Sequence, residues 1–290
     1  MPATTKSPIE HRDAHFADDM QALRLNSRSD HMKAVLRPTA DELNRDDWIA
    51  QQIEGFKGDV AQAESVRWKK QPLLTAAVAA QREDWVAQVL SWELSLELID
   101  DLHRTALHYA VQYESTGIVQ RLIAAGANLQ AQDGNHNTPL HIAAQVNWEK
   151  HVALLIESGA NMEAVTLLDK STPLIDAARM SLESAQVLLE KGANVHAQSK
   201  HGETPLIAAL AGGNPKAVPV LIDAGADVNH VDAQGWPVLW HALRRTEDLK
   251  NPDHNSVNLL LAAHANPRME LPQGKTLMHV AAEHGRLDHL

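Results

Sequence analysis

Residues 126–141 read Gly-Ala-Asn-Leu-Gln-Ala-Gln-Asp-Gly-Asn-His-Asn-Thr-Pro-Leu-His, and both ends of this stretch recur along the chain. The Gly-Ala-Asn end returns at intervals of 33 residues, at Gly126, Gly159, Gly192 and, with Asp in place of Asn, Gly225. A fixed period of about 20–50 residues is typical of proteins built from stacked repeats. The sequence therefore predicts an array of similar units rather than one compact globule.

The Thr-Pro-Leu-His end predicts the start of a helix in each unit. It returns as Thr172-Pro-Leu-Ile175 and Thr204-Pro-Leu-Ile207, thirteen and twelve residues after the preceding glycine. Thr accepts hydrogen bonds from the N–H groups that open a helix, and Pro has no N–H to leave unpaired there. A second, more apolar helix follows and ends at the glycine, which takes a left-handed conformation. Each unit is thus predicted to be two helices, joined to the next unit by a turn-rich hairpin.

This combination resembles the ankyrin repeat. The matching segments are residues 71–77, 105–110, 138–144, 172–178 and 204–210, with weaker ones at 237–243 and 276–282. The resemblance covers residues 71–290 and implies an all-α solenoid of stacked helix–turn–helix units with protruding β-hairpin loops, about seven units including degenerate ends. In this family the repeats are generally not enzymes, and they bind other proteins through the hairpin tips and the concave face made by the first helices.

The ends of the chain fit the repeat pattern less well. Residues 1–38 have no steady period and are expected to be a flexible or irregular tail. Residues 39–70 predict a helical N-terminal capping unit, with one helix around residues 48–53, a tight turn at 57–59 and a second helix over 60–68. Residues 71–290 form the array, whose last unit is incomplete after Gly285. We expect either a truncated chain or a partner that helps to cover that end.

Composition excludes several classes of function. The net charge of −11 gives no basic footprint for nucleic acid or for an anionic membrane surface. The chain has no Cys, which excludes disulfides and thiol nucleophiles. Residues 1–20 contain no apolar run that could act as a signal peptide, and the sequence has no 18-residue apolar stretch. We therefore expect a cytoplasmic protein, monomeric by itself, whose partner is another protein in a 1:1 complex, with no nucleic acid and no membrane.

No catalytic or metal site is visible among the 17 histidines and the carboxylates. His108, His141 and His279 occupy the fourth place of the repeat motif, where the ankyrin resemblance implies hydrogen bonds between neighbouring units. His11 and His15 lack further metal ligands, and no Gly-x-Ser-x-Gly elbow occurs. We expect no catalytic residue, no metal and no cofactor.

The chain departs from the regular repeat pattern at two places, and we expect these to distinguish it from other repeat arrays. The hairpin after Gly159 is one residue longer than the others and holds Val165, Leu167 and Leu168, which either fold back on the next unit or contact another protein. In the sixth unit Trp240 replaces the motif His, at a position that is either core or interface. Residues 246–254 lengthen that unit by six residues, which is either a tolerated insertion or part of a binding surface.

The candidate partner-binding residues follow from the family's variable surface positions before and after the Thr-Pro-Leu-His motif, together with the two departures. Tyr, Trp, Met and Arg are enriched among them, as in protein interfaces. They are Leu102, Arg104, Gln112, Tyr113, Asn135, Asn137, Gln145, Leu167, Leu168, Arg179, Met180, Lys200, His201, Trp236, Arg244 and Arg245.

The leading functional hypothesis is a non-enzymatic protein–protein interaction module that acts by occlusion or scaffolding. One alternative is a dedicated inhibitor, such as an immunity protein that occludes the active site of a cognate toxin or enzyme. Another is a secreted effector that docks on a host protein, with residues 1–38 as a delivery signal. An enzyme would have to place its chemistry in residues 1–70, which is too short a segment for a core.

Overall fold

A computed structural model of the chain describes residues 40–113, 115–244, 255–272 and 274–279. The chain divides into two compact units, Met1–Lys57 and Gly58–Leu290. The described part of the first unit is the 16-residue helix α2, Ala40–Gly55, and the two residues that follow it. The boundary between the units lies inside the segment 39–70, for which the sequence predicted a capping unit. The predicted tail, residues 1–38, lies outside the described residues.

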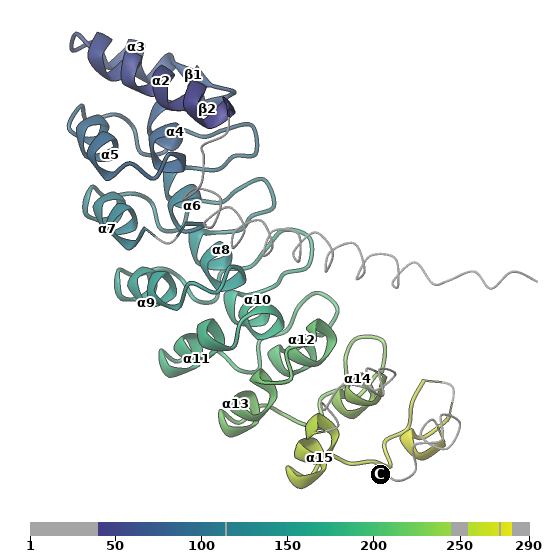
Figure 1. The fold of residues 1–290 in the computed structure, drawn as a ribbon. Coiled ribbons are helices and arrows are strands. Elements are labelled where there is room, and N and C mark those ends of the chain that lie inside the picture. Colours follow the sequence, from purple (N-terminus) through teal and green to yellow (C-terminus); the bar gives the residue numbers. More distant parts are fainter. Residues whose placement is uncertain (1–39, 114, 245–254, 273, 280–290) are drawn as a thin grey trace, which may run out of the picture. The chain divides into compact units, whose positions relative to one another are not determined.

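The second unit is a stack of helix pairs (Figure 1). The pairs are α4 and α5, α6 and α7, α8 and α9, α10 and α11, α12 and α13, and α14 and α15. Each first helix packs on the first helix of the next pair, and each second helix packs on the next second helix. The first helices are α4 (Leu73–Ala79), α6 (Ala106–Ala110), α8 (Pro139–Gln145), α10 (Pro173–Met180), α12 (Pro205–Gly212) and α14 (Val238–Arg244). The second helices are α5 (Glu83–Leu90), α7 (Thr116–Ala124), α9 (Glu149–Glu157), α11 (Leu182–Glu190), α13 (Ala217–Asp223) and α15 (Asn255–Ala262).

The segment before the first pair differs from the sequence prediction. Helix α3 spans Val60–Ser65, capped by the Asp59 carboxylate, which accepts from the Gln62 N–H at 3.0 Å. The helix predicted over residues 60–68 is therefore too long. The chain turns extended at Val66 and forms a two-stranded hairpin, with β1 at Arg67–Trp68 paired antiparallel to β2 at Gln71–Pro72. A hairpin strand cannot continue a helix, so this first connection ends α3 early.

The predicted end of each second helix is confirmed. Gly126 has φ +90°, and the corresponding glycines of the next three units lie at +88° to +99°. The Ala127 N–H donates to the Leu122 carbonyl at 3.0 Å and the Gly126 N–H to the Ile123 carbonyl at 2.9 Å, the bond pair that satisfies the last carbonyls of a helix. In the sixth unit His264, with φ +68°, takes the same place.

The motif histidines join neighbouring units, as the ankyrin resemblance implied. In α8 the His141 Nδ1 accepts from the Thr138 N–H at 3.2 Å, so Nε2 carries the proton and donates to the Ser171 carbonyl of the next unit at 3.1 Å. His108 makes the same bonds to Thr105 and Asn137. Burial lowers the pKa of His108, which keeps the imidazole neutral and Nδ1 free to accept.

We expect His141→Ala to destabilise the array by about 1–3 kcal/mol. The substitution leaves the buried Thr138 N–H and Ser171 carbonyl without their partner. Urea unfolding followed by circular dichroism measures the loss. His196→Ala is the control, because the His196 side chain is exposed. Equal stability of the two variants would show that the inter-unit bonds of His141 contribute nothing.

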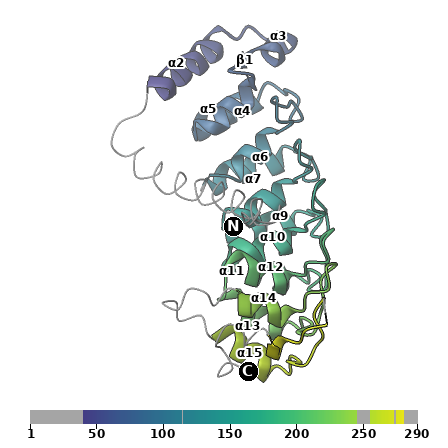
Figure 2. The same ribbon diagram turned by 90° about the vertical axis from the view of Figure 1, so that its right-hand side faces the viewer.

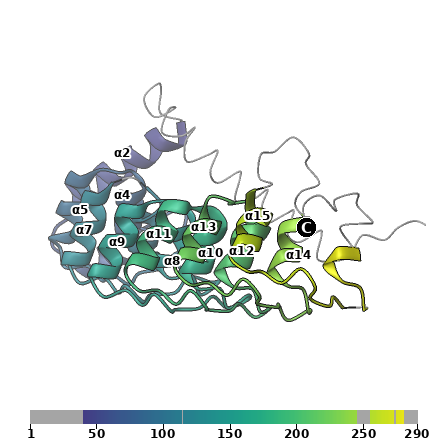
Figure 3. The same ribbon diagram turned by 90° about the horizontal axis from the view of Figure 1, so that it is seen from below.

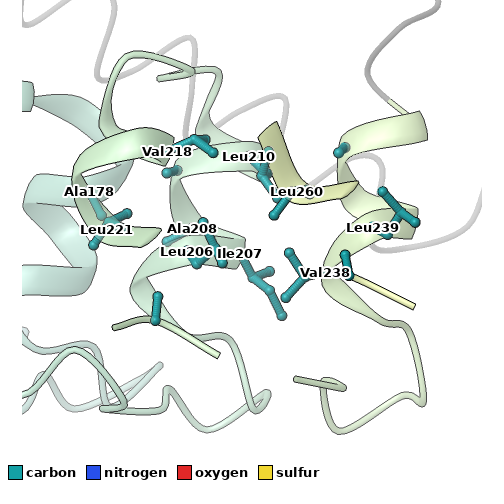
Figure 4. Packing of buried hydrophobic residues seen from close by; sticks show 14 of the residues in the cluster. Ala178, Leu206, Ile207, Ala208, Leu210, Val218, Leu221, Val238, Leu239 and Leu260 are labelled. Atoms are coloured by element: carbon teal, nitrogen blue, oxygen red, sulfur yellow. The ribbon is translucent and has the colours of Figure 1, made fainter. Parts of the chain in front are cut away.

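The core runs continuously from one helix pair to the next (Figure 4). Leu206 and Ile207 of α12 lie between Ala178 of α10 on one side and Val238 of α14 on the other, all essentially inaccessible to solvent. Ala residues at the contacts let the helices approach closely. Because each pair buries its apolar face only against its neighbours, the pairs have to stack to be stable.

Candidate protein-binding surface

The connections between successive pairs project on one side of the stack and line up beside one another (Figures 2 and 3). Each connection is closed by one backbone hydrogen bond across its end. The closing bonds run from Asp100 N–H to Arg104 carbonyl (3.1 Å), Asp133 to Asn137 (2.9 Å), Thr166 to Ser171 (3.1 Å), Ser199 to Glu203 (2.9 Å), Asp232 to Trp236 (3.0 Å) and Leu271 to Lys275 (2.7 Å).

The residues enclosed by these bonds are called tips below. Tip 1 is residues 101–103, tip 2 is 134–136, tip 3 is 167–170, tip 4 is 200–202 and tip 5 is 233–235. Tip 3 has four residues where the other tips have three. The extra residue of the longer hairpin, which the sequence predicted, therefore lies at the very end of the connection.

The side chain that opens each three-residue tip fixes its shape. The Asp133 carboxylate accepts from the N–H groups of Asn135 and Asn137, both at 2.8 Å. Asp100, Ser199 and Asp232 make the equivalent bonds in their own tips. These side chains satisfy backbone groups that a turn otherwise leaves to water. The tips are therefore locally ordered rather than loose.

A ladder of backbone hydrogen bonds joins each tip to the next. The Gly134 N–H donates to the Leu102 carbonyl at 2.8 Å, Leu167 to Asn135 at 2.9 Å, Lys200 to Asp169 at 2.7 Å and Ala233 to His201 at 2.9 Å. In tips 2 and 4 the residue that donates and the residue that accepts are consecutive. In tip 3 they are Leu167 and Asp169, so Leu168 is the additional residue.

The leucines of tip 3 lie on the outside of the molecule. Leu167 is 52% exposed and Leu168 56%, and Val165 is also exposed. Of the two alternatives that the sequence left open, folding back on the next unit is not what the structure shows. Leu102 of tip 1 is a further exposed apolar side chain, at 58%. The tips therefore present apolar groups that the stack itself does not use.

Several predicted binding residues on the first helices, or in the turn directly after one, are engaged in contacts between units. The Gln145 Nε2 donates to the Asp176 carboxylate at 2.9 Å, and Arg179 forms an ion pair with Glu203. The Gln112 carbonyl accepts from the Trp148 indole N–H at 3.2 Å. These bonds fix the positions of the three residues, which are only partly exposed.

Arg104 belongs to a buried polar network at the start of the array. Its guanidinium donates to the Asp100 carboxylate at 2.9 and 3.0 Å and lies over the Tyr109 ring, 4.3 Å from the centroid. The Tyr109 hydroxyl donates to Asp100 at 2.8 Å and accepts from Gln71 at 2.9 Å. Burial and the bond to Asp100 raise the pKa of Tyr109 to about 12. Burial alone would raise the pKa of Asp100, but hydrogen bonds from Arg104 and Tyr109 outweigh it and hold the pKa below its ordinary value of 3.8.

We expect this network to make stability depend on pH at the acid end. The folded pKa of Asp100 lies below its unfolded value, so its contribution is present above the unfolded pKa and is lost as the pH falls through the folded pKa. The difference in unfolding free energy between the wild type and Asp100→Asn should be constant near neutrality and narrow below about pH 4. Urea unfolding at a series of pH values measures it. A difference that stays unchanged into the acid range would contradict the assignment.

Trp236 and Trp240 form a stacked pair at the sixth unit. Their ring centroids are 4.3 Å apart, and the Arg244 guanidinium lies 5.3 Å from the Trp240 ring centroid. His241 contacts Trp240 edge-on and pairs with the Asp232 carboxylate at 3.0 Å. Burial would raise the pKa of Asp232, but hydrogen bonds from His241 and the Trp236 N–H hold it below its ordinary value. Trp240 is partly exposed, so it is neither fully core nor free surface.

The structure places the sixteen predicted binding residues in three groups. Those exposed to solvent are Leu102, Asn135, Leu167, Leu168, Lys200, His201 and Arg244. Those partly buried are Arg104, Gln112, Tyr113, Asn137, Gln145, Arg179, Met180 and Trp236. Arg245 and the insertion 246–254 lie outside the described residues.

The sequence reasoning overlooked the internal partners of the polar residues. Asp100 and Asp176 were not among the predicted residues, although they hold Arg104 and Gln145 in place, as Glu203 holds Arg179. For Asp100 the available signal was the recurrence of Asp or Ser six residues before the first helix of a unit, at Asp100, Asp133, Ser199 and Asp232.

The described residues hold neither a cluster of metal-ligating side chains nor a helix that could cross a membrane. Within that part of the chain, no three His, Asp or Glu side chains gather as a metal would require. None of the described helices combines the length and the apolar character of a membrane span.

Comparison with known proteins identifies the repeats. A family model described as ankyrin repeats (3 copies) matches residues 107–199, and a second, ankyrin repeats (many copies), matches residues 177–222. The chain is an ankyrin-repeat protein, and its stacked helix pairs are the fold of that family. No curated protein has a sequence that matches this chain.

A solved structure supports the same conclusion for most of the chain. The ankyrin repeat domain of Bcl-3, a member of the IkappaB protein family, is similar with a TM-score of 0.66 and 26% sequence identity. The match covers 74% of this chain and 96% of that one. Because 527 solved chains match, the likeness defines the fold and a protein-binding class of function, but not an individual partner.

Proposed function

We propose that this protein is a non-enzymatic interaction module that binds a partner protein through its tips and through the face of its first helices. The observation that supports this most directly is the surface of tips 1 and 3. They present Leu102, Leu167 and Leu168, each more than half exposed, on a ladder whose backbone is held by hydrogen bonds within and between the tips. Burial of such apolar groups against another protein is favourable, and little conformational entropy is lost on binding because the groups are already held in place.

The first-helix face supplies the second part of the proposed surface. Tyr113, in the turn after α6, and Met180, the last residue of α10, are partly exposed at this face, among polar side chains fixed by the bonds between units. A face of this kind offers aromatic and flexible apolar contacts inside a polar surround, which is the composition of protein interfaces. Binding to it requires little rearrangement of the array.

Site-specific photo-crosslinking in native lysate tests the proposal. A benzophenone side chain replaces Asn135 at tip 2 or Tyr113 on the first-helix face, and, as a control, exposed Glu183 on the second helix α11. The first two positions should crosslink to one protein that the control position does not capture. Light scattering of the purified complex should then give one copy of each chain.

Two results would contradict the proposal. One is the same set of crosslinks from all three positions, or from none of them. The other is turnover of a substrate by the purified protein alone. If mixing with the captured partner abolishes an activity of that partner in proportion to the complex formed, the module acts as an inhibitor rather than as a scaffold.

A further inference from the structure

The lengthened tip carries information about the kind of partner. Tip 3 is the four-residue tip, and Leu168 is the residue added between the two bonds of the ladder. The addition leaves the closing bond from Thr166 to Ser171 and the adjoining helices α9 and α10 in place. The added residue therefore changes the tip itself, where two adjacent leucines are exposed, and not the helices beside it.

Tip 3 is held from both sides, so the leucines project from a fixed base. The Leu167 N–H donates to tip 2, and the Asp169 carbonyl accepts from tip 4. The Lys200 ammonium of tip 4 also donates to the Leu168 carbonyl at 3.0 Å. At the base of the tip, the Ser171 N–H donates to the Thr166 hydroxyl at 3.0 Å. A short apolar projection on a rigid base fits a recess in a folded protein, because it loses little conformational entropy on entry.

The charge around the leucines differs from that of the whole chain. Lys170 and Lys200 are both exposed beside them, and the single carboxylate of tip 3, Asp169, lies 3.8 Å from His201. The Lys200 ammonium bonds a neutral carbonyl, so its charge is not cancelled there. In a protein with a net charge of −11, the base of this projection is locally positive.

We infer that tip 3 inserts Leu167 and Leu168 into an apolar pocket of a folded partner protein whose rim carries carboxylates. The inference rests on the proposed function and names the chemistry of its partner. An anionic membrane is the other surface that takes up leucines flanked by lysines. The net charge of −11 opposes approach to such a surface, whereas a pocket meets only the locally positive tip.

The experiment uses the full chain in two steps. A benzophenone side chain at position 168 is crosslinked in native lysate beside the probe at Tyr113, and the crosslinked residues of the captured protein are mapped. The captured protein is then purified and titrated calorimetrically with the wild type, with a variant lacking Leu168, and with Leu167→Ser. Val60→Ser is the matched control, since Val60 is an exposed apolar side chain on α3, away from the tips.

We expect position 168 to crosslink to an apolar recess bordered by Asp or Glu. Removal of Leu168 returns tip 3 to three residues, and this variant and Leu167→Ser should each weaken binding by about 30-fold or more. Val60→Ser should bind as the wild type does. Combined Lys170→Gln and Lys200→Gln should slow association and flatten its dependence on salt concentration. Thermal unfolding of each variant should stay near that of the wild type, because no buried side chain is changed.

Other outcomes overturn the inference, and they show whether the proposed function fails with it. If position 113 crosslinks to a partner but position 168 does not, or if removal of Leu168 leaves the affinity unchanged, tip 3 is not the anchor although the module binds. If neither position crosslinks, the proposed function fails as well. A third outcome is that the protein sediments with vesicles of phosphatidylcholine and phosphatidylserine in equal parts and loses this binding when Leu168 is removed. That result would show that tip 3 binds a membrane and not a protein pocket. An unaltered salt dependence in the double Lys variant would exclude the carboxylate rim.

Discussion

Replacement of Leu206 by alanine is expected to lower the free energy of unfolding by about 2–5 kcal/mol. Leu206 is completely buried in the continuous core, between Ala178 and Val238 (Figure 4). The substitution removes apolar contacts on both sides and leaves a cavity that the short helices cannot close. Urea unfolding of the full chain measures the loss, and the exposed Leu167→Ala is the control, expected within about 0.5 kcal/mol of the wild type.

The damage from Leu206→Ala should also be local. Stability in stacked repeats is a sum of unit and nearest-neighbour contributions, so units far from α12 keep their own contacts. Hydrogen exchange should therefore rise most in α12 and α13, less in the helices α10 and α14, and least in α4 and α5. Uniform exchange throughout the second unit would show that the array unfolds as one cooperative block, contrary to this expectation.

Replacement of Gly202 by alanine is expected to cost about 2–5 kcal/mol, from two separate causes. Gly202 has φ +71°, which costs an alanine about 1–2 kcal/mol. A Cβ atom there would also lie 2.6 Å from the backbone nitrogen of Ala233, which tip 5 uses to bond tip 4. Forcing the two tips apart costs a further amount of about 1–3 kcal/mol.

Gly225 separates these two causes. It has φ +88°, but a Cβ atom built on it meets nothing within 4 Å. Gly225→Ala should therefore show only the conformational cost, and the difference between the two variants measures the close contact between tips 4 and 5. Equal losses in calorimetric melts of Gly202→Ala and Gly225→Ala would mean that the tips separate without cost, and that the ladder adds no stability at this position.

The fold was predictable because its determinants are local. The left-handed conformation at Gly126 and the helix opened at Thr172, whose hydroxyl accepts from the Ile175 N–H, each depend on residues within one or two turns. Because each unit meets the same local requirements, the same residue types recur at the same positions of the units. The second helix at residues 60–68 was predicted wrongly because its apolar pattern continues through Trp68, whereas the pairing of β1 with β2 takes those residues into a hairpin.

The candidate surface was predictable only in part, because its side chains depend on partners set by the stack. Position in the motif identified Arg104, Gln145 and Arg179 as surface residues, yet each is held by a carboxylate. Gln145 finds its carboxylate, that of Asp176, in the following unit. No local pattern reveals such a pair. The leucines of tip 3 were identified because the greater length of the connection and its apolar residues are both visible in the sequence.

The closing bonds across the tips have a consequence for the descent of such proteins. Each tip is enclosed by a single closing bond, so a codon gained or lost inside it changes the side chains that the tip presents and leaves both adjoining helices in register. Tip 3, with Thr166 still bonded to Ser171 around one extra residue, is an instance of such a change. An insertion inside a helix would shift its apolar face, whereas an insertion in a tip is tolerated. Single-residue changes in the tips therefore give an array a route to a new target while the stacked helices are inherited unchanged.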